Sequence, residues 1–256
     1  MTVVATVGTT HPLAFAGLAF AALALAAESV RPVCVVAGVT AQDASRVLIR
    51  TPLDGATIRA QFEALRGAGV GAFHVGALVS ADAVHAVADS LRSFAGVPVV
   101  VDPVLAATGG DALADDATRD AIRDALLPCA TLVTPNLGEA GALLGRAVTD
   151  LASMRDAAAA LVGLGARAAL VKGGHLSGDD AVDVLAGEHG PREFASRRVA
   201  GTMRGTGDLL AVTIAASLAR DAPLPEAIEH ARRRVREAIA RGVEFAGTRV
   251  ATFEPE

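Results

Sequence analysis

The sequence predicts an α/β protein, a three-layer α/β/α sandwich built around a mostly parallel central sheet. Short apolar runs alternate with longer segments of helical periodicity along nearly the whole chain. The apolar runs are rich in β-branched residues, as expected of parallel strands that are covered on both faces. Neither a long linker nor a change in composition interrupts this alternation. We therefore expect residues 1–256 to form a single domain.

The strands expected in this sheet are 3–7, 33–37, 70–78, 97–101, 131–134 and 168–171, with an edge hairpin formed by 181–185 and 192–196. The helices expected between and after them are 13–27, 54–66, 80–94, 116–127, 138–144, 153–164, 207–219 and 225–245. Pro12 suits the first turn of the first helix, and Asp54 suits the N-cap of the second. In the third helix, Val84, Val87 and Leu91 share one face, which we expect to pack on the sheet.

Composition argues for a soluble, cytoplasmic small-molecule protein rather than a nucleic-acid or membrane protein. The chain has 52% hydrophobic residues, a net charge of −5, and neither Trp nor Tyr, so it lacks both a basic surface and stacking platforms for bases. The uncharged stretch 13–27 is shorter than the roughly 20 residues of a membrane span, and no Lys or Arg precedes it. Cys34 and Cys129 both lie in apolar segments, and we expect buried free thiols in a reducing compartment.

Polar residues follow several of the expected strands at the edge where ligands bind in such sheets. Asp102 follows strand 97–101, and it suits either a Mg²⁺ ligand or an Asx turn before Pro103. Asn136 and Glu139 follow strand 131–134, and they suit either a cation and phosphate site or a simple capping box. Gln42 follows the second strand, and its side-chain amide suits hydrogen bonds to the edge of a heterocyclic ring. The alternative is an ordinary polar loop residue.

Strand 168–171 ends in Lys172-Gly173-Gly174-His175. A lysine before two glycines can reach a phosphate as a point charge, and the alternative is a surface lysine before a turn. His175 could contact substrate or phosphate, or it could be an exposed turn residue.

Gly205-Thr206-Gly207-Asp208 precedes a long apolar helix. Glycines let the backbone approach a ligand closely, and the free amides at the start of a helix attract anions, phosphate above all. A carboxylate beside such a site is repelled by the bound anion unless it has a catalytic role there. One such role is to take the proton of an attacking hydroxyl group. The alternative is a glycine turn with Asp208 as the N-cap. Because the other polar residues lie at neighbouring strand ends, we favour a site for phosphoryl transfer.

These motifs, in this order, resemble the hydroxymethylpyrimidine/phosphomethylpyrimidine kinases of the ribokinase-like superfamily, over about residues 33 to 242. The matching stretches are Thr40-Ala41-Gln42, Val101-Asp102-Pro103-Val104 with Gly109-Gly110, Thr134-Pro135-Asn136-Leu137 with Glu139-Ala140, Val171-Lys172-Gly173-Gly174-His175-Leu176 and Gly205-Thr206-Gly207.

The resemblance implies a ribokinase-like fold, ATP and Mg²⁺ as cosubstrate and cofactor, and a homodimer. It places Asp208 as the catalytic base with Gly205, Thr206 and Gly207 as the anion hole. It further implies that ATP is contacted by Lys172, Asn136, Thr206 and Gly207. The metal ligands would be Asp102 and Glu139, and the substrate contacts would be Gln42, Gly8 and Val104.

The chain departs from the family pattern on the acceptor side. The pyrimidine branch usually has cysteine at the position of Asp208, and an Asn-Thr-His or Asp-Thr-x run where this chain has 202–204, Thr-Met-Arg. After the first strand the family has Gly-Ser-Asp and a glycine cluster, and here 8–17 lack the aspartate and most glycines. A methionine expected near Gly76 is replaced by Ala77-Leu78.

We therefore expect an ATP-dependent kinase that phosphorylates 4-amino-5-hydroxymethyl-2-methylpyrimidine, or its monophosphate, in thiamine biosynthesis. The alternatives are a pyridoxal- or pyridoxine-type kinase and a non-catalytic nucleotide-binding homologue. We expect the acceptor to be a small heterocyclic alcohol.

Overall fold

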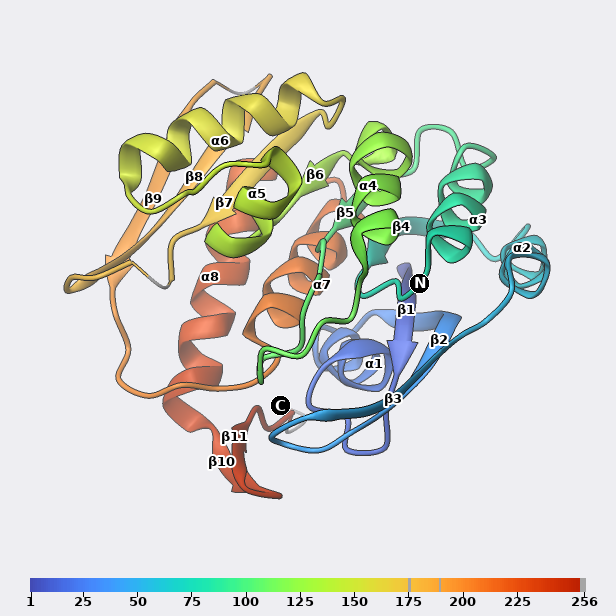
Figure 1. Cartoon of the computed structure of the whole chain (residues 1–256), viewed down its shortest axis with the longest axis horizontal. Coiled ribbons are helices and arrows are strands. Elements are labelled where there is room, and N and C mark those ends of the chain that lie inside the picture. The colour runs from blue at the N-terminus through green and yellow to red at the C-terminus, as the bar shows by residue number, and fades with distance from the viewer. Residues whose placement is uncertain (175, 189, 254–256) are drawn as a thin grey trace.

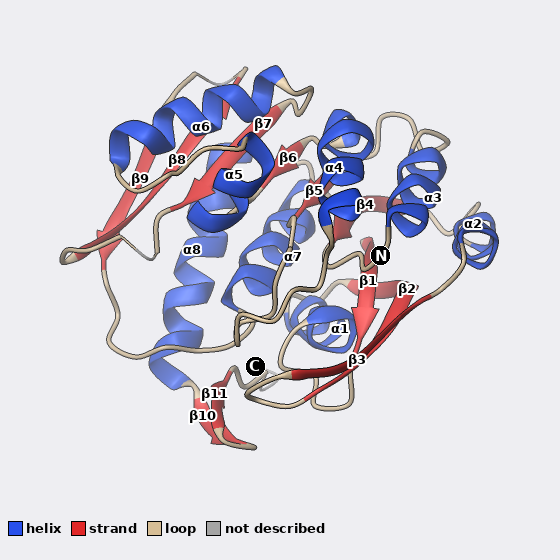
Figure 2. Cartoon of the chain, viewed as in Figure 1, coloured by secondary structure: helices blue, strands red, loops and turns tan. Residues whose placement is uncertain are grey.

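The computed structural model describes residues 1–174, 176–188 and 190–253, so His175 lies outside the described residues. Its centre is a nine-stranded sheet in the order β3-β2-β1-β4-β5-β6-β7-β8-β9 (Figures 1 and 2). Strands β2, β1, β4, β5, β6 and β7 are parallel, and β3, β8 and β9 add antiparallel edges. Their bounds are β1 Val3–Thr10, β2 Arg31–Gln42, β3 Val47–Pro52, β4 Val70–Val75, β5 Val99–Val101, β6 Leu132–Val133, β7 Ala168–Lys172, β8 Asp180–Gly187 and β9 Arg192–Arg197.

Helices cover both faces of this sheet, and each helical layer has its own apolar core. One core joins the sheet to α2, α3, α4, α5 and α6, and the other joins the opposite face to α1, α7 and α8 (Figure 1). The three-layer arrangement and the mostly parallel sheet predicted from the sequence are therefore confirmed. The bounds are α1 Gly17–Ala27, α2 Gly55–Ala64, α3 Ala81–Leu91, α4 Asp116–Ala121, α5 Leu137–Leu144, α6 Leu151–Gly163, α7 Thr206–Leu218 and α8 Leu224–Arg241.

Short polar side chains start most of these helices. Asp54 caps α2 as predicted, because its carboxylate accepts a hydrogen bond from the Thr57 amide at 2.9 Å. Ser80 caps α3 in the same way.

Helix α7 differs from the other helices, because all of its residues from Asp208 to Leu218 are buried. It packs against α1 and α8 and contacts the central strands β1, β4 and β5, and its first turn lies at the cavity.

Several predicted boundaries are wrong. The first helix begins at Gly17 rather than at residue 13, so Pro12 lies outside it, and 11–16 form a loop in which Ala14 has a φ of 50°. The last helix ends at Arg241, because the chain turns at Gly242 into an antiparallel pair, β10 (Val243–Phe245) and β11 (Thr248–Val250). The α4 segment changes to a π-helical turn over Ile122–Leu126 and a 3-10 turn over Leu127–Cys129.

Two further features differ from expectation. Strand β3 is not predicted, since its exposed side chains lack a buried alternating pattern. Cys34 is exposed rather than buried, because β3 pairs only with residues 38–42 of β2 and leaves the part that carries Cys34 uncovered. Cys129 is half-buried, and both are free thiols. Within the described residues, no helix combines the length and the apolar character needed to cross a membrane.

Candidate active site

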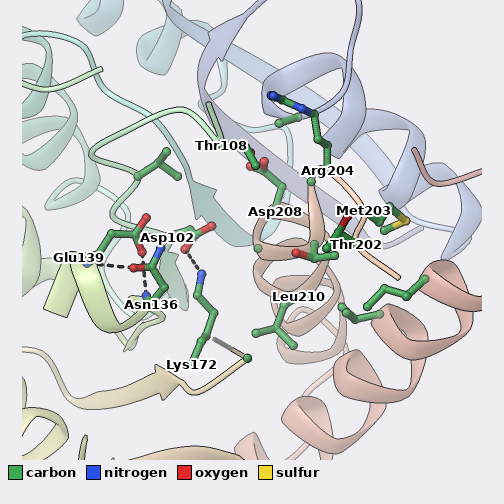
Figure 3. Close-up of a pocket in the computed structure, with 18 of the residues that line it drawn as sticks. Asp102, Thr108, Asn136, Glu139, Lys172, Thr202, Met203, Arg204, Asp208 and Leu210 are labelled. Carbon is green, nitrogen blue, oxygen red and sulfur yellow. Dashed lines mark hydrogen bonds and ion pairs between the residues drawn. The ribbon is translucent and has the colours of Figure 1, made fainter. Parts of the chain in front are cut away.

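A cavity of about 1290 Å³ opens at the carboxyl ends of the parallel strands. The segments that follow β1, β5, β6 and β7 line it, together with the first turn of α7 and the last turns of α8. Figure 3 shows Asp102, Asn136, Glu139 and Lys172 gathered on one side of Asp208, with Thr202, Met203 and Arg204 on the other. The sequence-predicted polar residues therefore meet at one edge of the sheet.

Lys172 and Asp102 form an ion pair at the centre of this group. The Lys172 ammonium group lies 2.7 Å from Asp102 Oδ1, and the two side chains are 15% and 3% exposed. The Thr134 hydroxyl donates to the same carboxylate oxygen at 3.2 Å. Burial lowers the pKa of Lys172, but the carboxylates of Asp102 and Glu139 outweigh it and the net pKa is raised. Lys172 is thus a buried, charged group, and the surface lysine and the Asx turn considered from the sequence are both wrong.

Asn136 and Glu139 form the capping box that was the simpler interpretation of their spacing. Asn136 Oδ1 accepts from the Glu139 amide at 2.9 Å, and Glu139 Oε2 accepts from the Asn136 amide at 2.8 Å. Both residues also line the cavity. Burial raises the pKa of Glu139 to about 7, with a further rise from Asp102 and an opposing effect of Lys172. A capping role therefore leaves this carboxyl group available to the site, next to the ion pair.

The N-terminus of α7 has no side-chain cap. Gly205 occupies the N-cap position with a φ of 78°, and among the described residues no side chain accepts from the first-turn amides. A side chain at this position would be strained and its Cβ would lie 2.4 Å from the Phe15 carbonyl oxygen. A Cβ on Gly207 would lie 3.1 Å from both Asp102 Oδ2 and the Lys172 ammonium group. The two glycines thus bring uncapped amides against the ion pair, an arrangement that can hold an anion.

Asp208 lies inside the first turn of α7, so the alternative that it caps this helix is wrong. The residue is 8% exposed, and its carboxylate accepts from the Gly17 amide at 3.4 Å. Burial raises the pKa of Asp208 to about 7, and the negative charge of Asp102 adds to the rise, whereas the Gly17 hydrogen bond and Lys172 oppose it. At neutral pH this group can therefore both accept and release a proton.

The residues expected to contact the acceptor are only partly brought together. Gln42 and Val104 line the cavity, and the Gln42 amide group makes no hydrogen bond to any described residue. Gly8 does not line it; it is buried within β1, and a Cβ there would meet Ala77. Thr9 at the end of β1 and the loop that follows this strand line the cavity instead.

Sequence reasoning gave no role to His11, Phe15 and His74. His11 and Phe15 line the cavity from the loop between β1 and α1. His74 lies beneath Gly76, with Nδ1 2.9 Å from the Thr6 hydroxyl oxygen, and burial lowers its pKa to about 4. His11 directly follows β1 in the structure, but the strand expected from the sequence ends at residue 7, so no local signal marked this histidine.

Comparisons with known proteins agree with this geometry. The chain matches the model of the family described as phosphomethylpyrimidine kinase over residues 16–252. It is 39% identical over 209 residues to the hydroxymethylpyrimidine/phosphomethylpyrimidine kinase of Rhizobium meliloti, covering 80% of this chain and 78% of that protein. It is 40% identical to the protein of the same name from Streptomyces coelicolor, covering 83% and 79%. The solved structure of an ADP complex of Bacillus subtilis pyridoxal kinase is 26% identical, with a TM-score of 0.90 over 99% of this chain and 97% of that one.

Proposed function

The chain belongs to the phosphomethylpyrimidine kinase family, and we propose that it transfers the γ-phosphoryl group of ATP to 4-amino-5-hydroxymethyl-2-methylpyrimidine or its monophosphate, as in thiamine biosynthesis. One observation carries the proposal for this chain. A buried carboxyl group, Asp208, lies in the same helical turn as uncapped amides and beside a buried ion pair. Such an arrangement supplies both a base and an anion site, which phosphoryl transfer requires.

In this proposal Asp208 takes the proton of the acceptor hydroxyl group as its oxygen attacks the γ-phosphorus in line. The bond from the γ-phosphorus to the bridging oxygen breaks, and ADP leaves. The amides of Thr206 and Gly207 and the ammonium group of Lys172 stabilise the charge that develops on the phosphates. A pKa of about 7 for Asp208 suits this task, because general bases work best when their pKa lies near the working pH.

The cavity has the size for two ligands at once. Its volume of about 1290 Å³ exceeds the roughly 300–1,000 Å³ of a typical small-molecule site. Val235 and Ile239 of α8, together with Leu210, give one end an apolar lining, and we propose that the adenine ring packs there. The acceptor then occupies the opposite end, next to Gln42 and Val104.

The residues at the ion pair also fit Mg²⁺. Asp102 Oδ2 faces Gly207, while Oδ1 is taken by Lys172, and Glu139 adds a second carboxyl group. The described residues hold no cluster of three or more potential metal-binding side chains. Mg²⁺ is commonly held by one or two carboxylates together with substrate phosphates and water, so Asp102 and Glu139 would hold it here. When bound, it would screen the charge of the nucleotide phosphates.

A pyridoxal-type vitamer is the competing acceptor, favoured by the structural likeness to the Bacillus subtilis pyridoxal kinase and by an aspartate rather than a cysteine at position 208. ADP release, measured by a coupled assay with the pyrimidine alcohol, its monophosphate, pyridoxine and pyridoxal, distinguishes them. Turnover with a pyridine alcohol alone would overturn the pyrimidine assignment. ATP binding in calorimetry without transfer to any of these acceptors would favour a non-catalytic homologue.

We also propose that the whole chain acts as one kinase domain and that it forms a homodimer. Sedimentation of the purified protein would report a mass near twice 25.7 kDa if the second proposal holds.

A further inference from the structure

Two buried side chains of opposite charge lie beside the stretch that follows Lys172. Asp183 of β8 and Arg232 of α8 are 9% and 8% exposed, and Arg232 Nη1 lies 3.4 Å from Asp183 Oδ2. Both residues line the cavity, and neither takes part in the proton transfer or in the Lys172–Asp102 pair. Burial of an ion pair costs solvation that its attraction does not always repay, so stability alone does not explain this pair.

Asp183 holds the first residue after Lys172. Its Oδ1 accepts a hydrogen bond from the Gly173 amide at 2.9 Å, while Oδ2 faces Arg232. Gly173 packs tightly against β8 at this point, since a Cβ on it would lie 2.0 Å from the Val182 carbonyl oxygen. Lys172 and Asp183 are also direct partners in the antiparallel β7–β8 pair. The Lys172 side chain therefore extends from a backbone whose position the Asp183 carboxylate helps to fix.

Arg232 joins Asp183 to helix α8 and to the edge strands. Its guanidinium group donates to the Phe194 carbonyl oxygen, to the Ala181 carbonyl oxygen at 2.9 Å and to the Ser196 hydroxyl oxygen at 3.0 Å. These bonds and the Asp183 carboxylate engage both terminal nitrogens of the group. Arg232 is therefore fixed in place by the protein itself.

The same face of α8 forms the end of the cavity where we place the adenine ring. Arg232, Val235 and Ile239 follow one another at intervals of three and four positions, which is the spacing of one helix face, and all three line the cavity. The other end of the Asp183–Arg232 chain is the Gly173 amide, next to the lysine of the phosphate site (Figure 3). The pair thus links the adenine end of the cavity to its phosphate end.

We propose that Asp183 and Arg232 are positioning residues for the nucleotide. They hold Lys172-Gly173-Gly174 at a fixed place relative to α8, so that one ATP molecule contacts both at once. The inference rests on the proposed function, because it takes ATP as the ligand of this end of the cavity. Misplacement of a positioned group by about 1 Å can cost about a hundredfold in rate. Loss of the pair should therefore weaken nucleotide binding and leave the acceptor KM unchanged.

Asp183→Asn, Arg232→Lys and Arg232→Met test this role by calorimetry with AMP-PCP. In each titration the stoichiometry reports the folded fraction and the dissociation constant reports the site, so a loss of folded protein alone does not change the constant. We expect Arg232→Met to weaken AMP-PCP binding about ten- to hundredfold, as is typical when a bond to a charged group is lost. Asp183→Asn and Arg232→Lys keep part of the hydrogen bonding and should weaken it less.

Glu229→Gln is the matched control. Glu229 also joins α8 to β9, through an exposed ion pair with 2.6 Å between Glu229 Oε1 and Arg192 Nη2. Its removal should leave the AMP-PCP affinity unchanged. The double variant Asp183→Leu with Arg232→Met replaces the buried pair by apolar side chains, an exchange that is often neutral for stability. It should bind AMP-PCP as weakly as Arg232→Met even where its melting temperature returns to that of the wild type.

Turnover adds a readout that a purely structural role would not move. In Arg232→Met the KM for ATP should rise by the same factor as the AMP-PCP dissociation constant, while the acceptor KM at saturating ATP stays the same. Wild-type AMP-PCP affinity in all of these variants would overturn the positioning role. An equal rise of both KM values, or a double variant that recovers its affinity together with its melting temperature, would overturn it as well.

A failure of the proposed function is a separate result. If the wild-type chain transfers phosphate to no acceptor but AMP-PCP binds more weakly to Arg232→Met, the kinase proposal fails and the positioning role stands. If the wild-type chain turns over and the affinity is the same in Arg232→Met, the positioning role fails alone. Absence of AMP-PCP binding by the wild-type chain would overturn both.

Discussion

Asp208→Asn should lower activity and raise stability in the same molecule. Asparagine keeps the shape of the side chain and an oxygen that can accept from the Gly17 amide. It cannot accept the acceptor proton, so turnover with an alcohol should fall by about two to four orders of magnitude, while ATP still binds. The change also removes a buried carboxyl group, whose ionised form is destabilised because burial deprives it of solvation.

The size of the stability gain follows from the pKa of Asp208, which burial raises from 3.8 to about 7. Between these two pH values the unfolded chain releases this proton and the folded chain keeps it, so the group's contribution to stability falls as pH rises. A tenfold change in an ionisation constant corresponds to about 1.4 kcal/mol. Above pH 7 the ionised carboxylate therefore destabilises the fold by at most about 4 kcal/mol. Asparagine removes this cost.

Urea denaturation of both proteins at pH 4 and at pH 8 measures the effect. We expect Asp208→Asn to gain stability relative to the wild type on going from pH 4 to pH 8, and the wild-type kcat/KM to rise through an apparent pKa near 7. Asp54→Asn is the control, because hydrogen bonds from Thr57 lower the pKa of Asp54 below its ordinary value of 3.8, so the stability difference between this variant and the wild type should change little between pH 4 and pH 8. A stability difference that is the same at both pH values, or near-normal turnover of Asp208→Asn, would refute the reasoning.

Three further changes test the site. Gly205→Ala should destabilise the chain by about 1–3 kcal/mol in urea titrations, because the residue has a positive φ and its new Cβ would collide with the Phe15 carbonyl; a neutral result would contradict the left-handed cap. Lys172→Met should cost about 3–5 kcal/mol by leaving Asp102 buried and unpaired, and should weaken ATP binding in calorimetry; an unaffected ATP affinity would remove Lys172 from the phosphate site. Glu139→Gln keeps a capping-box residue but loses the charge, so the Mg²⁺ concentration for half-maximal turnover should rise while the melting temperature changes little; an unchanged requirement would argue against Glu139 as a ligand.

The sequence by itself determined the layers, the positions of the buried strands along the chain and the stretch that carries Asp208. These features depend on local patterns: β-branched runs, helical periodicity, short capping residues and glycines before an apolar helix. It also placed Asp102, Asn136, Glu139 and Lys172 close together, because the carboxyl ends of neighbouring parallel strands lie on the same side of the sheet.

Tertiary structure alone decided what those side chains do to one another. The spacing of Asp102 and Lys172 along the chain contains no sign that they form an ion pair, and the pKa of Asp208 depends on burial beneath a loop that begins near His11. The same holds for Phe15 and Arg204, which are almost two hundred positions apart and meet only in the folded chain, where the guanidinium carbon lies 5.6 Å from the ring centroid. Local patterns fix where a residue lies along its element, whereas charge, solvation and partners depend on contacts between elements that no local pattern records.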